Sequence, residues 1–166
     1  LNRRNMERLM TAPVSRDTHK PTSRARHPLA DRTRFKVWNT DKLRLTDLDH
    51  QYHVNNAVFA VLYTSGRHDF IYSHVRPLVA ESDMFAMAKI TIEYLAEMHY
   101  PGEVEVGTLI RRRGRTSITF GHGMFKDGKC VSVAEAVMVL LDPATRRAKS
   151  LPADTATRLA RFIDAD

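Results

Sequence analysis

The fold and the chemistry of this chain are indicated most clearly by Thr46-Asp47-Leu48-Asp49-His50-Gln51-Tyr52-His53-Val54-Asn55-Asn56. This stretch gathers two carboxylates, two imidazoles and several side-chain amides between an apparent strand and an apparent helix. Ordinary turns use one or two Asp or Asn residues for local hydrogen bonds and do not usually add two histidines. An apolar run at residues 57–63 follows at once and opens the helix. Polar groups held at the start of a buried helix suit chemistry on an electrophilic carbonyl group.

The helix that follows this stretch is predicted to run from about Asn55 to His74. Pro77 ends it, because the residue before a proline is disfavoured in the helical conformation. The first half of the helix is apolar nearly all round, which is typical of a buried helix. Gly66 lies in its middle, where glycine costs about 1 kcal/mol relative to alanine. We therefore expect another backbone to approach the helix closely at this position.

Five strands are predicted around the helix, at residues 35–45, 87–96, 103–110, 116–126 and 130–141. Pro101-Gly102 and Asp127-Gly128 mark turns between consecutive strands, the second being a strong signal for a two-residue hairpin. A short helix is expected at residues 155–163. This order predicts an α+β fold in which a five-stranded antiparallel sheet faces one very apolar helix, because that arrangement buries both.

Small residues on two strands are expected to make room for the helix. One face of the last strand carries Cys130, Ser132, Ala134 and Ala136, and Gly121 and Gly123 share a face of the preceding strand. Cys130 is the chain's one cysteine, so an internal disulfide is excluded and an oxidising compartment has no support. We expect it to be a packing residue rather than a nucleophile.

Length and composition indicate one globular domain. The chain has 166 residues, of which 43% are hydrophobic and 27% charged. No apolar stretch approaches the length needed to cross a bilayer, so we expect no membrane span. A cytoplasmic location is the default expectation.

The positive charge is concentrated near the N-terminus. Residues 1–35 hold nine Lys/Arg and three Asp/Glu, whereas the rest of the chain holds seventeen and sixteen. We predict a basic, extended arm at residues 1–34 and a folded domain at residues 35–166. A solvated tail is the plainest interpretation of the arm, with a targeting segment or a phosphate-binding arm as alternatives. Nucleic acid is not an expected partner, because the body shows no interleaved aromatic surface.

The segment from Asp47 to Ala57 resembles the D-x-D-x-x-G-H-V-N-N signature of hotdog-fold acyl-CoA thioesterases of the 4-hydroxybenzoyl-CoA thioesterase type. It is also similar to the D-x-D-x-x-Q-H-V-N-N segment of acyl-ACP thioesterases. The likeness extends from about Trp38 to Arg158 and includes Ile92-Glu93-Tyr94-Leu95 and the turn Gly114-Arg115-Thr116-Ser117. It implies a single hotdog domain and hydrolysis of an acyl-CoA or acyl-carrier thioester without a cofactor. Because hotdog relatives pair their sheets edge to edge, a homodimer or homotetramer is expected.

The resemblance also implies the roles of residues in the motif. Asp49 is placed as the catalytic carboxylate, and Gln51 and His53 occupy catalytic positions of the acyl-ACP enzymes. The backbone N–H nearest Asn56 would stabilise the oxyanion at the helix start. Tyr52 stands where many members have Gly and others Gln, so this residue is expected either to contact substrate and narrow the acyl pocket or to alter the loop.

Each of these residues has a structural alternative. Asp49 could turn the chain or cap the helix, and His53 could orient the loop. Asp47 is expected to hold the loop through backbone donors, and Asn55 to cap the helix beside the substrate. A metal site from Asp49, His50 and His53 is disfavoured, since no Cys or further His cluster follows.

A second charged group, Arg111-Arg112-Arg113-Gly114-Arg115, lies at a hairpin end. A solvated turn is one interpretation. The other assigns Arg113 and Arg115, with Ser117, to the phosphates of coenzyme A, because bidentate recognition favours Arg over Lys. The non-enzymatic alternative for the whole chain is a hotdog module that binds or scaffolds an acyl thioester.

Overall fold

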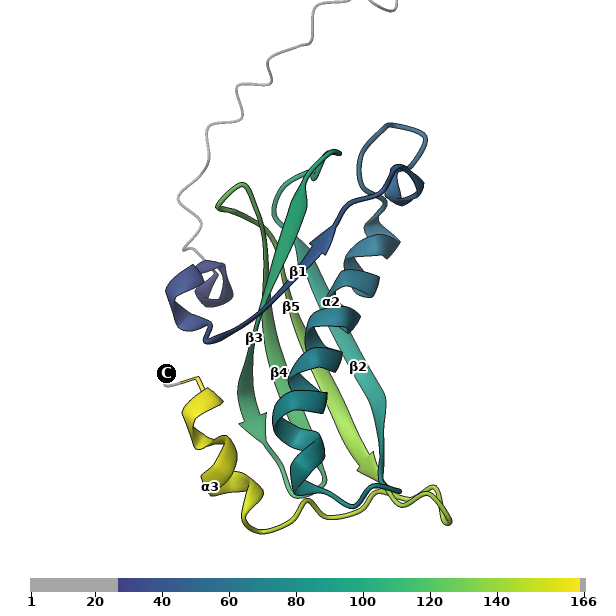
Figure 1. Cartoon of the computed structure of the whole chain (residues 1–166), viewed down its shortest axis with the longest axis vertical. Helices are drawn as coiled ribbons and strands as arrows, with labels where there is room; N and C mark the ends of the chain where they lie inside the picture. The colour runs from purple at the N-terminus through teal and green to yellow at the C-terminus, as the bar shows by residue number, and fades with distance from the viewer. Residues whose placement is uncertain (1–26, 165–166) are drawn as a thin grey trace, which may run out of the picture.

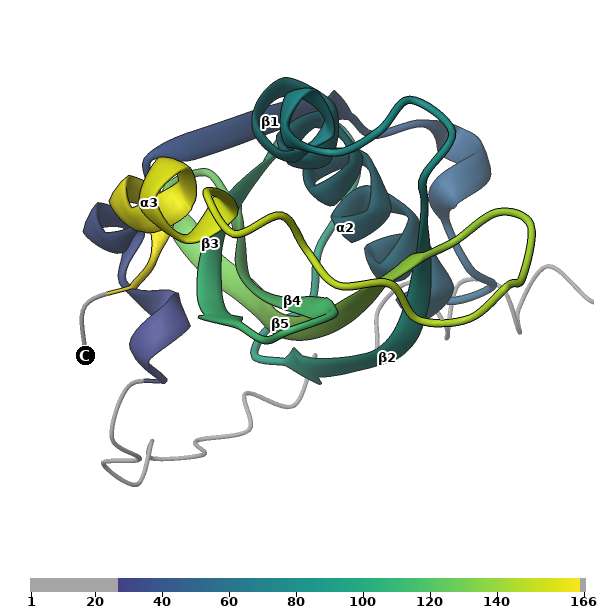
Figure 2. The ribbon, with the colours of Figure 1, turned by 90° about the horizontal axis from the view of Figure 1, so that it is seen from below.

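A curved five-stranded antiparallel sheet wraps around one long helix in the computed structural model, which describes residues 27–164 (Figures 1 and 2). The strands lie in the order β1-β3-β4-β5-β2. Their bounds are β1 Val37–Lys42, β2 Met84–Tyr94, β3 Glu103–Arg113, β4 Ser117–Lys126 and β5 Lys129–Leu141. The predicted hotdog architecture is confirmed, with strand ends that shift by a few residues.

The long helix α2 (Asn56–Phe70) lies in the concave face of the sheet and continues as a π-helical turn at Ile71–Val75. Tyr63 and Phe70 are each 0% exposed, which confirms that the helix is buried. Its core contacts come from β3, β4 and β5 along most of its length. The loop that precedes α2 and the turns that follow it therefore lie at opposite ends of the sheet, separated by the length of the helix.

Gly66 marks the close approach of α2 to β3. A Cβ at this position would lie 2.8 Å from Cγ1 of Val106 and 3.5 Å from Oγ1 of Thr108. The close approach expected from the sequence is present, but side chains of β3 make it rather than a backbone. Ser132 and Ala134 line the helix side of β5 as expected, since Ala134 packs in the cluster that contains Tyr63.

The expectation that Gly121 and Gly123 make room for the helix is wrong. A Cβ at Gly123 would lie 2.6 Å from the carbonyl oxygen of Leu29, and one at Gly121 would lie 3.0 Å from Cδ2 of the same leucine. Both glycines face the convex side of the sheet, where the segment before β1 covers them. Alternation along β4 defines two faces, but it does not say which face a helix covers.

The segment before β1 belongs to the folded domain. Residues 27–34 form two 3₁₀ turns, Pro28–Ala30 and Arg32–Arg34, and Leu29 is 2% exposed against the sheet. Arg32 adds a bidentate pair to Glu105 of β3, with N···O distances of 2.6 and 2.9 Å. Residues 27–34 of the predicted arm thus pack on the sheet, and residues 1–26 lie outside the described residues.

The C-terminal segment packs against the end of α2 and along β3, where it also contacts the segment before β1. Helix α3 (Thr155–Leu159) and a 3₁₀ turn at Ala160–Phe162 occupy the predicted 155–163 range. Phe162 packs on Phe70 with ring centroids 5.1 Å apart. Asp164 donates its N–H to the carbonyl of Ile110. Within residues 27–164 no helix is long and apolar enough to span a membrane.

Candidate functional site

The loop between Leu48 and Val54 is a closed turn. These two residues form an isolated antiparallel bridge, and the N–H of Asp49 donates to the carbonyl of His53 at 2.9 Å. Val54 then donates to the carbonyl of Met98 at 2.8 Å. The loop is thus fixed both to itself and to the segment that follows β2.

Asp49 holds this loop with one carboxylate oxygen. Its Oδ1 accepts hydrogen bonds from the N–H groups of Gln51 at 2.8 Å and His53 at 3.2 Å. Its Oδ2 accepts no hydrogen bond within the described residues. The carboxylate therefore has a fixed position and one oxygen available for a proton.

Asp47 and Asn55 position the start of the helix. Oδ2 of Asp47 accepts from the N–H of Arg44 at 2.7 Å, while its carbonyl accepts from the N–H of Asn55 at 2.8 Å. Oδ1 of Asn55 accepts from the N–H of Ala57 at 2.9 Å, so Asn55 is the N-cap of α2. These bonds match the structural role expected for Asp47 and the cap expected at Asn55.

Asn56 is the first residue of α2, and its N–H donates no hydrogen bond within residues 27–164. The positive end of the helix dipole lies behind this donor. The hydroxyl of Tyr94, at the end of β2, donates to the carbonyl of Asn56 at 3.1 Å. This bond joins the helix start to the end of β2, so both sides of the site are fixed relative to each other.

A cleft of about 390 Å³ opens where the loop, the helix start and the end of β2 meet. Its floor is apolar and includes Phe59, which is 3% exposed and packs edge-on against Tyr94 at 5.1 Å. The lining residues are Asp49, His53, Val54, Asn56, Phe59, Tyr94, Leu95, Ala96, Glu97 and Met98. The cleft thus brings together Asp49, His53 and the first residue of α2 above an apolar surface.

The segment from Tyr94 to Met98 carries no motif that indicates a role in the site. Its signal in the sequence is the apolar pair Tyr94-Leu95 at a strand end, and both side chains are about half exposed. Its place beside the loop depends on pairing across some forty residues of chain, which local patterns do not encode.

His53 faces this segment. Its Nε2 lies 3.7 Å from Oε2 of Glu97, and its ring packs edge-on against that of His99 at 4.8 Å. The imidazole is one-third exposed. It lines the same cleft as Asp49.

Gln51 and Tyr52 do not line the cleft within the protomer. Both residues are exposed, Tyr52 to 79%. Tyr52 has φ 63°, in the left-handed region that glycine adopts at little cost. The departure from Gly thus concerns backbone conformation, and in the protomer the ring does not narrow the cleft.

The expected phosphate-binding residues lie at the opposite end of α2, where β3 ends and β4 begins (Figure 1). Arg113 donates to Oγ1 of Thr155 and to the carbonyl of Pro152, each at 3.0 Å. Arg115 donates to Oγ of Ser150 at 3.2 Å, and Ser117 pairs with Gly114 in the turn. One protomer does not bring these residues to Asp49, and Arg113 holds the C-terminal segment.

A buried polar cluster between helix and sheet was not anticipated. Nδ1 of His122 lies 3.1 Å from Oγ1 of Thr108, and Arg67, 2% exposed, donates to the carbonyl of Tyr63 and to Oγ1 of Thr64. Burial, aided by the charge of Arg67, lowers the pKa of His122 to about 3. Burial also lowers the pKa of the Arg67 guanidinium. His122 is therefore neutral in the folded protein and lies outside the cleft.

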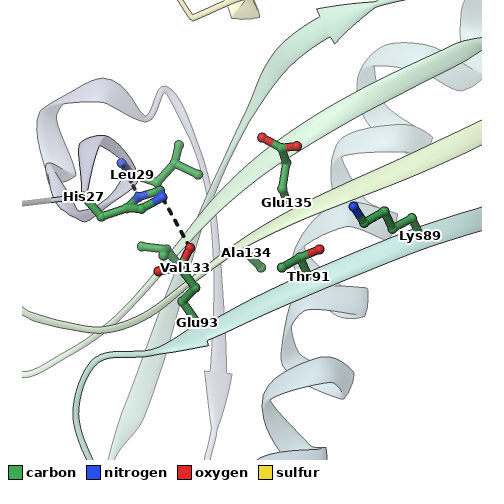
Figure 3. A pocket seen from close by; sticks show the side chains of 8 residues that line it. All are labelled: His27, Leu29, Lys89, Thr91, Glu93, Val133, Ala134 and Glu135. Atoms are coloured by element: carbon green, nitrogen blue, oxygen red, sulfur yellow. Dashed lines mark hydrogen bonds and ion pairs between the residues drawn. The ribbon is translucent and has the colours of Figure 1, made fainter.

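A second hollow, of about 280 Å³, lies on the convex side of the sheet (Figure 3). His27 points toward Glu93 across it, with Nε2 3.9 Å from the carboxylate. Lys89, Thr91 and Glu135 complete its polar lining. No free helix N–H lies among these residues, so the convex hollow lacks the donor that the cleft provides.

The match to a family model decides the family. Residues 43–159 match the thioesterase-like superfamily. The chain belongs to this superfamily. Its hotdog fold and the motif from Asp47 to Ala57 agree with that membership.

Solved structures share the fold. A predicted thioesterase from Bacillus stearothermophilus is 23% identical, with 78% of this chain and 98% of that one covered and a TM-score of 0.71. A thioesterase from Thermus thermophilus, complexed with coenzyme A and zinc, is 26% identical (75% and 98% covered, TM-score 0.66). A hypothetical protein from Staphylococcus aureus in complex with CoA is 19% identical (75% and 82% covered, TM-score 0.67). No curated protein sequence matches significantly.

Proposed function

We propose that this protein is an acyl-CoA thioesterase that hydrolyses an acyl thioester to a free acid and a thiol. The observation that carries the proposal is the shared cleft of Asp49 and the free N–H of Asn56. The superfamily membership supports the reaction class, and the coenzyme A in two structural neighbours supports the leaving group.

The reaction needs a base and an oxyanion donor. Asp49 takes a proton from water through its free oxygen as the water attacks the thioester carbonyl. The negative charge that develops on the carbonyl oxygen is stabilised by the N–H of Asn56 and the helix dipole. Collapse of the tetrahedral intermediate breaks the C–S bond, and the departing thiolate takes up the proton. The apolar floor at Phe59 accepts the first part of the acyl chain.

A dimer would complete the site. Strand β2 is an outer strand of the sheet, and Met84, Met87 and Tyr94 along it are 42–50% exposed. Unpaired edges attract a further strand. Antiparallel pairing of two β2 strands places the Met84 end of one copy beside the Tyr94 end of the other. The end of the sheet that carries Arg115 of the partner subunit would then lie toward this cleft, within reach of a bound coenzyme A.

Light scattering at micromolar concentration tests this assembly, and we expect a dimer or a tetramer. A Met87→Lys substitution on β2 should shift the protein toward monomers, whereas Lys36→Glu on the segment before β1 should not. A monomeric wild-type protein would contradict the proposed assembly.

Release of free thiol from a panel of acyl-CoAs tests the activity. Asp49→Asn keeps an oxygen that can accept from Gln51 and His53 but removes the charge that a base needs. We expect kcat to fall by about 10²–10⁴-fold with KM much less affected, because general-base assistance contributes that much. Asp47→Asn is the control, since Asp47 contacts only backbone and should act through stability.

One observation favours the alternative, a non-catalytic module that binds acyl thioesters. Oδ1 of Asp49 accepts hydrogen bonds from two backbone N–H groups, so a structural role in holding the loop also accounts for this carboxylate. Absence of turnover with every acyl-CoA, combined with measurable binding of a non-hydrolysable acyl-CoA, would favour that module over the enzyme.

A further inference from the structure

Two histidines and a glutamate converge at the rim of the cleft. The Nε2 atoms of His53 and His99 each lie 3.7 Å from the same oxygen, Oε2 of Glu97. One ligand atom from each residue lies within 4.8 Å of the other two. We propose that His53, Glu97 and His99 form a binding site for a divalent transition-metal ion such as Zn²⁺.

Both distances to Glu97 are longer than a hydrogen bond, although they fall within the range of ion pairs. Hydrogen bonds from N–H to oxygen span about 2.7–3.2 Å, so neither imidazole forms one with Glu97. Two ligand atoms that each lie about 2.0–2.2 Å from a tetrahedral zinc ion are separated by about 3.4 Å. The separations to Glu97 are therefore close to those that an ion between the three side chains requires.

The backbone already holds the three residues in place. The N–H of Val54, next to His53, donates to the carbonyl of Met98, which lies between Glu97 and His99 in the sequence. Met98 is 1% exposed, whereas Glu97 and His99 are exposed on either side of it. Closing the site around an ion thus needs side-chain rotation alone, and a fixed backbone makes that inexpensive in entropy.

The ligand types select the ion. Two imidazoles and one carboxylate suit Zn²⁺ and Co²⁺, while Mg²⁺ and Ca²⁺ prefer all-oxygen sets. Three protein ligands leave a fourth position for water or a substrate oxygen, as in catalytic rather than structural zinc sites. This set shares only His53 with the Asp49, His50 and His53 set that the sequence disfavours. Metal binding is measured without turnover, so its test does not depend on the proposed thioesterase activity.

Titration of the full chain, without a histidine tag, with Co²⁺ tests the site. We expect one ion per chain, the intense visible absorption of four-coordinate cobalt, and displacement by Zn²⁺ but not by Mg²⁺. His99→Ala and Glu97→Ala should each weaken binding at least tenfold, because loss of even outer-shell partners costs about 10–100-fold. His50→Ala, an exposed histidine of the same loop, is the matched control and should bind like the wild type.

Three results would overturn the site. They are a wild-type chain that binds neither Co²⁺ nor Zn²⁺ at micromolar concentration, only the weak absorption of six-coordinate cobalt, and equal loss of affinity in His50→Ala and His99→Ala. Circular dichroism of each variant separates loss of a ligand from loss of the fold. Since His99 and Glu97 are exposed, both alanine variants are expected to fold.

Discussion

The backbone N–H of Tyr52 donates to the carbonyl of Asp49 at 3.1 Å, and Tyr52 stands in the turn that this bond closes with φ 63°. A side chain with a Cβ in this left-handed region costs about 1–2 kcal/mol. The exposed ring regains little of that by burial. The loop that holds the candidate catalytic carboxylate therefore contains one strained residue, at the position where the family motif has glycine.

Replacing Tyr52 by glycine should relieve this strain. Tyr52→Ala is the matched control, because alanine loses the ring but keeps the Cβ. Glycine also gains about 0.5–1 kcal/mol of entropy in the unfolded chain, so we expect Tyr52→Gly to be more stable than Tyr52→Ala by about 0.5–1 kcal/mol. Urea unfolding measures the difference. An alanine variant as stable as the glycine variant would show that the turn is not strained.

Local patterns in the sequence were enough to predict the strands, the buried helix and the cap at Asn55. Alternation and the dipeptide Asp127-Gly128 are encoded within a few residues, and the Asx cap bonds only two residues ahead. The resemblance to hotdog thioesterases, likewise, was visible from a contiguous motif. These features depend on residues that are close together in the sequence.

Features that depend on long-range packing were not predictable in the same way. The sequence does not tell that Leu29 packs over Gly123 on the convex side of the sheet. By composition residues 27–34 resemble a basic tail, and only the folded structure shows that they pack on the sheet. The cleft wall at Tyr94–Met98 and the buried His122 likewise arise only when distant segments meet. Placement of Arg113 away from Asp49 follows from the length of α2, which separates the two ends of the sheet.

The buried His122 should make stability depend on pH. Burial, then the charge of Arg67, lowers its pKa from 6.5 to about 3, so the folded protein holds it neutral. The unfolded chain binds a proton there below its ordinary pKa of about 6.5. Burial of neutral His122 therefore contributes fully to the free energy of unfolding above pH 6.5. This contribution is lost as the pH falls from 6.5 toward 3. The slope from this one group is at most about 1.4 kcal/mol per pH unit.

Urea unfolding of wild type and His122→Phe at pH 7, 6, 5 and 4 isolates this effect. The pKa of His74 is also lowered, by burial and by Arg161, and its contribution is common to both proteins. We expect the variant to lose less stability than the wild type between pH 6.5 and 4, whatever its stability at pH 7. His50→Ala, which removes an exposed histidine, should retain the wild-type slope. Parallel curves for wild type and His122→Phe would contradict a depressed pKa.

The N–H of Asn56 can be removed without removing the helix. Asn56 is the first residue of α2, the position where proline is best tolerated, because its N–H has no partner within the helix. Asn55 has φ −55° and ψ 135°, the extended conformation that a residue before proline prefers. Asn56→Pro should therefore fold, and the carbonyl that accepts from Tyr94 remains in place.

If this N–H stabilises the oxyanion, Asn56→Pro should lower kcat for acyl-CoA hydrolysis by about 10²–10³-fold, which is the typical effect of losing one such donor. Asn56→Ala is the control, because it removes the side-chain amide and keeps the backbone N–H, and it should stay within a few-fold of wild type. Both variants should show wild-type circular dichroism. A folded proline variant with normal kcat would mean that the carbonyl oxygen binds elsewhere in the cleft. A large loss in Asn56→Ala would instead assign the role to the side chain.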